Sequence, residues 1–186
     1  MAKEELTLLQ TRIWKELSDA VSGSSHPWRV MNLATVDEQG GPQLRQVVLR
    51  SFDCETRQLL FYTDPRTPKW SQLLDNQCAE VLFWNPEEKE QLRCRVTVVL
   101  HREDELAHFH QKKIPPHFAG DYAAHSVPGS PLRDPAQGQE LGEKWNFGVV
   151  VLAMNRMDWL QLGHEGHRRA CFRWADEGLE AQWIQP

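Results

Sequence analysis

The sequence predicts a mainly β fold of the α+β class, in which an antiparallel sheet is accompanied by an N-terminal helix and a few short helices. One observation is a single amphipathic segment at the start of the chain, and another is a series of short runs rich in Val, Leu, Thr and aromatic residues after it. The third is that turn-forming residues separate these runs. A length of 186 residues suits one domain, so we expect a single domain over 1–186.

The opening segment, from about Lys3 to Val21, repeats apolar residues at spacings of three and four. These residues are Leu6, Leu9, Ile13, Leu17 and Ala20. This spacing places them on one face of a helix. We therefore expect an amphipathic helix that packs on the rest of the domain.

Nine strands are predicted after this helix. They lie near Arg29–Val36, Gln43–Phe52, Leu59–Thr63, Ala79–Trp84, Leu92–His101, Phe147–Met154, Met157–Leu162, Arg168–Trp174 and Glu180–Ile184. The segments Gln39–Pro42 and Asn85–Glu88 are rich in turn formers and too short for a parallel crossover. Antiparallel hairpins and a sheet that closes on itself are the expected result.

Two short helices are expected between strands, at Pro68–Asn76 and Glu103–Lys113. The stretch from Ile114 to Lys144 is rich in Pro, Gly, Ser and His and has no clear periodicity. Connections of this length are often binding segments or disordered ones, and the sequence leaves both readings open.

Composition restricts the classes of function. The net charge is −5, and no basic block is present that would neutralise a run of phosphates, so we expect no nucleic-acid partner. No apolar run approaches the roughly 20 residues of a membrane helix and the first residues are acidic and polar, so we expect a cytoplasmic protein without a membrane partner. Four dispersed cysteines fit reduced thiols in the core: Cys54, Cys78, Cys94 and Cys171.

Four cations fall within a short region, at Arg45, Arg50, Arg66 and Lys69. Thr67 followed by Pro68 is typical of a helix start, with Thr67 as the N-cap. Free backbone N–H groups favour an anion at such a terminus, and basic side chains there oppose the helix dipole unless an anion compensates them. The alternative is that all four cations are ordinary solvated surface charges.

The order of motifs between Trp28 and Val98 resembles the flavin-binding core of the pyridoxamine 5′-phosphate oxidase superfamily. The matching segments are Arg45–Arg50, Phe61-Tyr62-Thr63, Thr67-Pro68-Lys69, Phe83-Trp84 and Glu90-Gln91-Leu92-Arg93. This resemblance implies an antiparallel split β-barrel that binds flavin mononucleotide (FMN).

The resemblance also implies roles for individual residues. Arg45, Arg50, Thr67 and Lys69, with Arg66 beside them, would hold the flavin phosphate and ribityl chain. The backbone from Arg45 through Gln46, Val47 and Val48 to Leu49 would follow the isoalloxazine ring, with Tyr62 and Thr63 flanking it. Gln91 would reach the ring from the partner subunit, because flavin sites of this superfamily form at the interface of a homodimer.

Arg45 and Arg50 present a geometric difficulty. They are five residues apart, so their side chains would face opposite sides of a regular strand. We therefore expect a bulge or a strand end between them.

The substrate side resembles the family less closely. The family's Tyr, Arg and Ser for substrate phosphate fall on about His108, Lys112 and Pro116, and of its C-terminal Arg-Leu-His-Asp-Arg motif Arg168 alone matches. Lys112 and Arg168 are the weak substrate candidates. The alternative for the first region is a solvated helix end that includes His108, His110, Lys112 and Lys113.

We expect an FMN-dependent oxidoreductase, similar to pyridoxamine 5′-phosphate oxidase, with a different small-molecule substrate. The protein would supply orientation and electrostatics while the flavin supplies the chemistry. No catalytic side chain can be assigned, and no strong metal-ligand pattern is present, so no metal is expected. The alternatives are a non-catalytic flavin- or haem-binding split barrel and, third, a deazaflavin protein.

Overall fold

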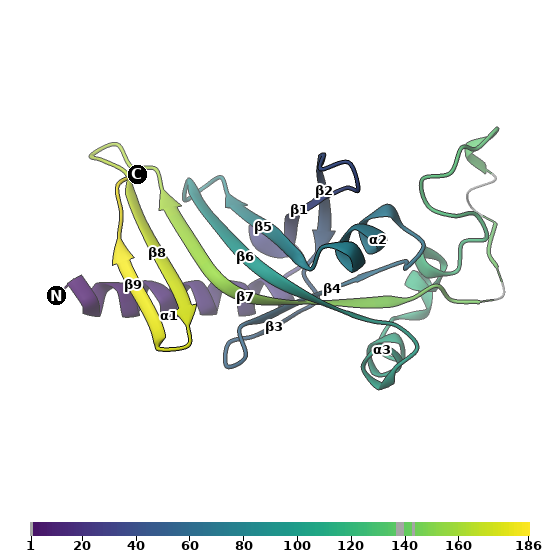
Figure 1. The fold of residues 1–186 in the computed structure, drawn as a ribbon, viewed down its shortest axis with the longest axis horizontal. Coiled ribbons are helices and arrows are strands. Elements are labelled where there is room, and N and C mark those ends of the chain that lie inside the picture. The colour runs from purple at the N-terminus through teal and green to yellow at the C-terminus, as the bar shows by residue number, and fades with distance from the viewer. Residues whose placement is uncertain (1, 137–139, 143) are drawn as a thin grey trace.

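The computed structural model describes residues 2–136, 140–142 and 144–186, and its nine strands belong to one antiparallel sheet (Figure 1). This confirms the predicted fold class. The strands are β1 Val30–Val36, β2 Pro42–Val48, β3 Ser51–Asp53, β4 Gln58–Thr63, β5 Cys78–Asn85, β6 Glu90–His101, β7 Gly148–Gln161, β8 Arg168–Ala175 and β9 Gly178–Trp183. The helices are α1 Ala2–Ser22, η1 Pro27–Arg29, α2 Pro68–Asp75, α3 Glu105–Gln111 and η2 Pro116–Tyr122.

Helix α1 lies across the β8–β9 end of the sheet and continues toward β3 (Figure 1). The apolar stripe read from the sequence is its buried face, made of Leu6, Leu9, Ile13, Leu17 and Ala20. The predicted packing of this helix is therefore confirmed. Among the described residues, no helix combines the length and apolar character needed to cross a membrane.

The barrel closes at a bend between β2 and β3. Strand β2 pairs with β1, and β3 pairs with β4 at the other end of the strand order β2-β1-β5-β6-β7-β4-β3. At the bend, Leu49 N–H donates to the carbonyl of Arg29 (2.9 Å) and Arg50 N–H donates to the carbonyl of Leu60 (2.8 Å). One continuous strand over Gln43–Phe52 was therefore the wrong expectation, because the chain changes partners there.

The strands predicted at Phe147–Met154 and Met157–Leu162 are one strand, β7. Its pairing with β6 shifts register between Arg95 and Val96, where Asn155 has no partner. Such a bulge bends a strand without ending it. The first half of β7 pairs with β4 and the second half with β8, so β7 connects the barrel to the β8–β9 hairpin.

The four cysteines do not share one environment. All are free thiols, which agrees with the absence of a disulfide framework. Cys94 and Cys171 are buried, whereas Cys54 and Cys78 are exposed, so the core assignment was wrong for the latter two. Cys54 lies in the turn between β3 and β4, and Cys78 begins β5.

A buried carboxylate joins α1 to the sheet. Glu90, the first residue of β6, is 1% exposed and accepts hydrogen bonds from the Arg12 guanidinium of α1 and the Trp159 indole N–H of β7. The Arg12 side chain also lies over the Trp159 ring, 5.6 Å from its centroid. The Glu90 carboxylate is therefore the hydrogen-bond acceptor of both the Arg12 guanidinium and the Trp159 indole N–H.

Replacing Glu90 with Ala should destabilise the fold by about 2–3 kcal/mol, because a buried indole N–H loses its acceptor and Arg12 its counter-charge. The value is below that of a fully buried pair because the Arg12 side chain is 40% exposed and can be hydrated. Urea denaturation measures this change. Glu88→Ala, in the same hairpin but exposed, is the control and should stay within about 0.5 kcal/mol; equal effects of the two variants would contradict the anchoring role.

Candidate functional site

Two cationic side chains lie together at the end of the barrel that α2 covers. Arg45 donates to the carbonyl of Leu33 (3.3 Å), to Thr35 Oγ1 (2.5 Å) and to Gln72 Oε1 of α2 (3.0 Å). Lys69, in the first turn of α2, donates to Thr63 Oγ1 (3.1 Å) at the end of β4. All these acceptors are uncharged, so the cations are held in place without being neutralised.

The start of α2 places hydroxyl groups beside Lys69. Thr67 occupies the predicted N-cap position and Pro68 the first turn, as expected. The Thr67 hydroxyl does not cap the helix; it donates to the carbonyl of Asp64 (2.7 Å) and lies 3.4 Å from Thr63 Oγ1. The helix N-terminus therefore has backbone donors that no Thr67 side chain satisfies.

The electrostatics of this cluster favour an anion. Burial lowers the pKa of Lys69, and the charge of Arg45 lowers it further, while Asp64 acts in the opposite direction. Burial also lowers the pKa of Arg45. A bound anion would relieve both the desolvation and the mutual repulsion of these groups.

Arg66 has a different environment from the other predicted phosphate ligands. Its guanidinium forms an ion pair with Asp64 (2.7 Å) and donates to the carbonyls of Ala124 (2.8 Å) and His125 (3.2 Å). These contacts attach the connection after η2 to the segment before α2. They also neutralise Asp64, which leaves Arg45 and Lys69 without a carboxylate in an ion pair among the residues that the structure describes.

Arg50 lies on the opposite side of β4 from Lys69. Its guanidinium carbon is 5.6 Å from the centroid of the Tyr62 ring, whereas Thr63, the next residue, faces Lys69. The strand end expected between Arg45 and Arg50 is present as the bend at Leu49, and the two arginines do not converge in one chain. Val47 and Leu49 are buried in the barrel, so only their backbone can meet a ligand.

His110 is part of the Arg50 side and not of a solvated helix end. Its Nδ1 lies 2.9 Å from the Tyr62 hydroxyl, and the two rings are 5.6 Å apart. Sequence reasoning missed this pair because α3 and β4 are distant in the chain and neither residue belongs to a motif that links them. His108, on the same helix, is exposed, as the solvated reading expected.

Gln91 lies far along β6 from Tyr62 and Thr63 of the same chain, whereas the register of Arg45 through β1 and β5 meets β6 at Cys94, three residues from Gln91. Gln91 pairs with Trp84 and Leu160 near the start of β6. Tyr62 instead pairs with Val149 of β7, which pairs with His101 at the other end of β6. Ten residues of strand correspond to roughly 33 Å along β6. Gln91 therefore lies far along the sheet from Thr63, whose hydroxyl Lys69 contacts.

A cluster of arginines shares the outer face of the sheet with Gln91. Asp158, 3% exposed, accepts from Arg93 (2.9 Å) and Arg169 (2.8 Å), with Arg156 at 3.6 Å. Burial disfavours ionisation of Asp158, but the hydrogen bonds from Arg169 and Arg93 outweigh it and lower the pKa of this carboxyl. The face therefore carries net positive charge.

The two weak substrate candidates lie apart from these groups. Arg168 lies over the Trp183 ring, 4.7 Å from its centroid, and near Glu5 of α1 (3.8 Å), on the opposite face of β8 from Arg169. Lys112 is exposed at the end of α3, and the cation that lines the neighbouring cavity is Lys113. Neither candidate lies beside Arg45 or Arg50.

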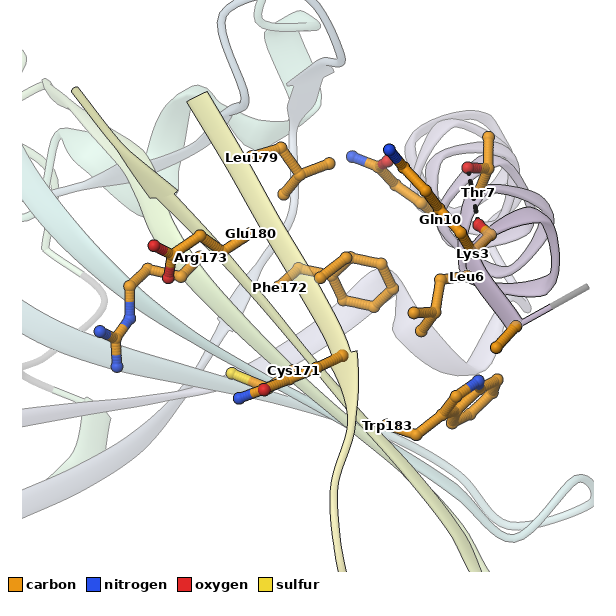
Figure 2. A pocket seen from close by; sticks show the side chains of 13 residues that line it. Lys3, Leu6, Thr7, Gln10, Cys171, Phe172, Arg173, Leu179, Glu180 and Trp183 are labelled. Carbon is orange, nitrogen blue, oxygen red and sulfur yellow. Dashed lines mark hydrogen bonds between the residues drawn. The ribbon is translucent and has the colours of Figure 1, made fainter. Parts of the chain in front are cut away.

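A larger groove separates α1 from β8 and β9 (Figure 2). Its volume is about 730 Å³, and Leu6, Phe172, Leu179 and Trp183 extend into the space between helix and strands. Arg173 and Glu180 point to the other side of the sheet. The groove contains none of the residues predicted to bind the flavin.

Known proteins resemble this chain over the predicted flavin-binding core. Residues 11–102 match the family model of the pyridoxamine 5′-phosphate oxidase FMN-binding domain. The chain belongs to this family, and its cofactor is FMN, as predicted.

Sequence relatives include pyridoxine/pyridoxamine 5′-phosphate oxidases. The one from Deinococcus deserti is 39% identical over 92 residues, which are 49% of this chain and 42% of the relative. The one from Gloeothece citriformis is 25% identical over 180 residues, covering 90% of this chain and 82% of the relative. The chain thus spans less than half the length of the first relative.

Two solved structures share the fold over nearly the whole chain. A pyridoxamine 5′-phosphate oxidase-related, FMN-binding protein from Nostoc punctiforme has a TM-score of 0.77 at 24% identity and covers 95% of this chain and 96% of its own. PhzG from Burkholderia lata, solved with tetrahydrophenazine-1-carboxylic acid, has a TM-score of 0.75 at 20% identity, with coverages of 98% and 92%. They confirm the split-barrel fold.

His110 should make stability depend on pH. Burial lowers its pKa, followed by the charges of Lys113 and His101, so the folded state favours the neutral ring. Its contribution is then complete above the unfolded pKa of about 6.5 and is lost as the pH falls toward the lower folded value. Thermal unfolding between pH 7.5 and 5 should show a smaller acid-induced loss of stability in His110→Gln than in the unmodified chain.

His108→Gln is the matched control, because His108 is exposed on the same helix. It should retain the acid-induced loss. An identical pH dependence in His110→Gln and the unmodified chain would contradict the assignment.

Proposed function

We propose that this chain is an FMN-dependent oxidoreductase that acts as a homodimer on a small molecule other than pyridoxamine 5′-phosphate. The observation that carries the proposal is the Arg45–Lys69 pair, two partly buried cations with uncharged partners at the start of α2. A phosphate dianion fits such a pair. When bound, FMN supplies the ability to accept a hydride from a substrate.

The roles of the chain's own residues follow from their positions. Arg45 and Lys69 bind the phosphate, and Thr63 and Thr67 supply hydroxyls beside it. Arg66 acts indirectly, since it neutralises Asp64 and attaches the connection that follows η2. The backbone from Gln46 to Leu49 offers polar groups to the ring.

The homodimer completes the site. Gln91 lies far along the sheet from Thr63, whose hydroxyl Lys69 contacts, and the family resemblance assigns it to the flavin of the partner. Its sheet face also presents the exposed side chains of Trp84 and Leu44. A second copy covering this face would bury these apolar groups and bring Gln91 to the partner's site.

An Arg45→Ala, Lys69→Ala double variant should bind FMN at least about a hundredfold more weakly, since each charge-assisted hydrogen bond contributes roughly 1.5–3 kcal/mol. Titration followed by flavin fluorescence measures the affinity. Lys15→Ala, at an exposed position of α1, is the control for a lost cation and should leave the affinity unchanged. Unchanged FMN affinity in the double variant would remove the phosphate assignment.

Combining two variants that each bind FMN weakly in one mixed dimer tests whether the two subunits share the FMN site. Dimers of Lys69→Ala alone and of Gln91→Ala alone should each bind FMN weakly, while a mixed dimer has one site with both residues intact. Co-expression with different affinity tags isolates the mixed species, which should recover half the tight sites. A monomer of 21.6 kDa by light scattering, or no recovery in the mixed species, would argue against shared sites.

Substrate identity requires a turnover measurement. Because the family's positions for substrate phosphate hold His108, Lys112 and Pro116 here, oxidation of pyridoxamine 5′-phosphate should be at least ~tenfold slower in kcat/KM than by the Deinococcus deserti enzyme, a loss of ~1.4 kcal/mol or more. Oxygen consumption by the FMN-loaded proteins measures both rates. Equal rates would show that the substrate is the ordinary one.

A further inference from the structure

A small cavity lies on the Arg50 side of β4, beneath α3 and η2. Its lining includes Arg50, Tyr62, Lys113, Ile114, Phe118 and Tyr122, and its volume is about 150 Å³. At ~30 Å³ for each water, this is the space of about five waters, enough for a molecule with one ring. We propose that this cavity is the substrate pocket of the proposed oxidoreductase and that it takes a small aromatic carboxylate.

Arg50 supplies the charge that a carboxylate requires. Its guanidinium lies against the Tyr62 ring, and Arg50 lines the same cavity as Tyr122. Among the described residues no carboxylate forms an ion pair with it, so its planar fork is available to an anion from the cavity. The fork matches the two oxygens of a carboxylate, which a single ammonium group does not.

The second cation of the pocket is held at its rim. The Lys113 ammonium lies 3.8 Å from the centroid of the Phe109 ring, and Phe109 is 53% exposed. The Lys113 side chain is exposed, and this cation–π contact already engages its charge. One guanidinium inside the cavity suits a monoanion better than a phosphate dianion.

The walls of the cavity suit a planar ring. Phe147 packs edge-on against both Tyr62 (5.0 Å) and Tyr122 (5.1 Å), which fixes the orientation of the two tyrosines. Phe118 and Ile114 complete an apolar lining. Aromatic side chains held in this way offer faces and edges to a ring at little cost in conformational entropy.

His110 is a positioning residue for this pocket. Its Nδ1 is hydrogen-bonded to the Tyr62 hydroxyl from outside the lining. The Tyr62 ring beneath Arg50 is thereby held from two sides, by Phe147 and by His110. The positions that the family uses for substrate phosphate, at His108, Lys112 and Pro116, all lie outside the lining.

Three probes separate the contributions of ring and charge. Benzoate has the ring and the carboxylate, phenyl phosphate has the ring and a dianion, and cyclohexanecarboxylate has the carboxylate without aromaticity. Isothermal titration calorimetry on the FMN-loaded protein, with the flavin absorption spectrum recorded in parallel, should give benzoate at least tenfold tighter binding than either analogue. Tighter binding of phenyl phosphate, or equal binding of all three, would overturn the proposal.

Variants of Arg50 distinguish the pocket from the cofactor site. Arg50→Gln should weaken benzoate binding at least tenfold and leave FMN affinity within threefold, and Arg50→Lys should fall between it and the unmodified chain. Arg102→Gln, an exposed arginine paired with Glu103, is the control and should change neither affinity. Loss of FMN from Arg50→Gln would place Arg50 in the cofactor site and overturn the proposal.

The assignment of this pocket rests on the proposed function, yet the experiments distinguish a failure of the pocket from a failure of the proposed function. No benzoate binding to a protein that still binds FMN overturns the pocket alone. No FMN binding by the unmodified protein overturns the proposed function, and benzoate titration of that protein then still reports on the pocket. His110→Gln, a milder change, should weaken benzoate binding severalfold without altering FMN affinity.

Discussion

The bend at Leu49–Arg50 is the constraint on which the rest of the structure depends. Up to Val48 the chain pairs with β1, and from Arg50 it pairs with β4, so two backbone hydrogen bonds close the sheet into a barrel. An antiparallel sheet of this size would otherwise leave two edges with unpaired backbone groups. The bend instead joins the two ends of the strand order through the chain itself, and apolar side chains of the barrel strands fill a common core.

The same bend places the Arg45 and Arg50 side chains on different sides of the barrel wall. Before it, Arg45 points to the barrel end that α2 covers; after it, Arg50 points to the outer side with Tyr62 and His110. Alternation along β4 repeats the division, because Thr63 meets Lys69 on one side while Tyr62 faces the other. One chain thus presents two cationic groups a single strand apart, one suited to a phosphate and one beside an aromatic cavity.

Local patterns were sufficient for much of the fold. The spacing of Leu6 to Ala20 identified the face of α1, and the turn formers at Gln39–Pro42 located a hairpin, because these features depend on neighbours in the sequence. The division of β7 was predicted wrongly because a bulge at Asn155 interrupts the apolar pattern without ending the strand. For the site, the geometry of Arg45 and Arg50 followed from strand alternation, whereas the Tyr62–His110 contact is tertiary and leaves no mark in either segment.

The charge pattern bears on the proposal that two copies of the chain share the site. Lys69 and Arg45 form one end of the proposed site, and Gln91 lies at the opposite end of β6 from His101, the residue level with Tyr62. The sheet face around Gln91 carries Arg93, Arg156 and Arg169 on a single buried Asp158, in a chain whose net charge is −5. Positive charge gathered on one face of an acidic protein favours contact with an acidic surface. In the proposed dimer, both parts of the site belong to strands or helices of the folded sheet domain, so association would assemble the site from elements that are already folded.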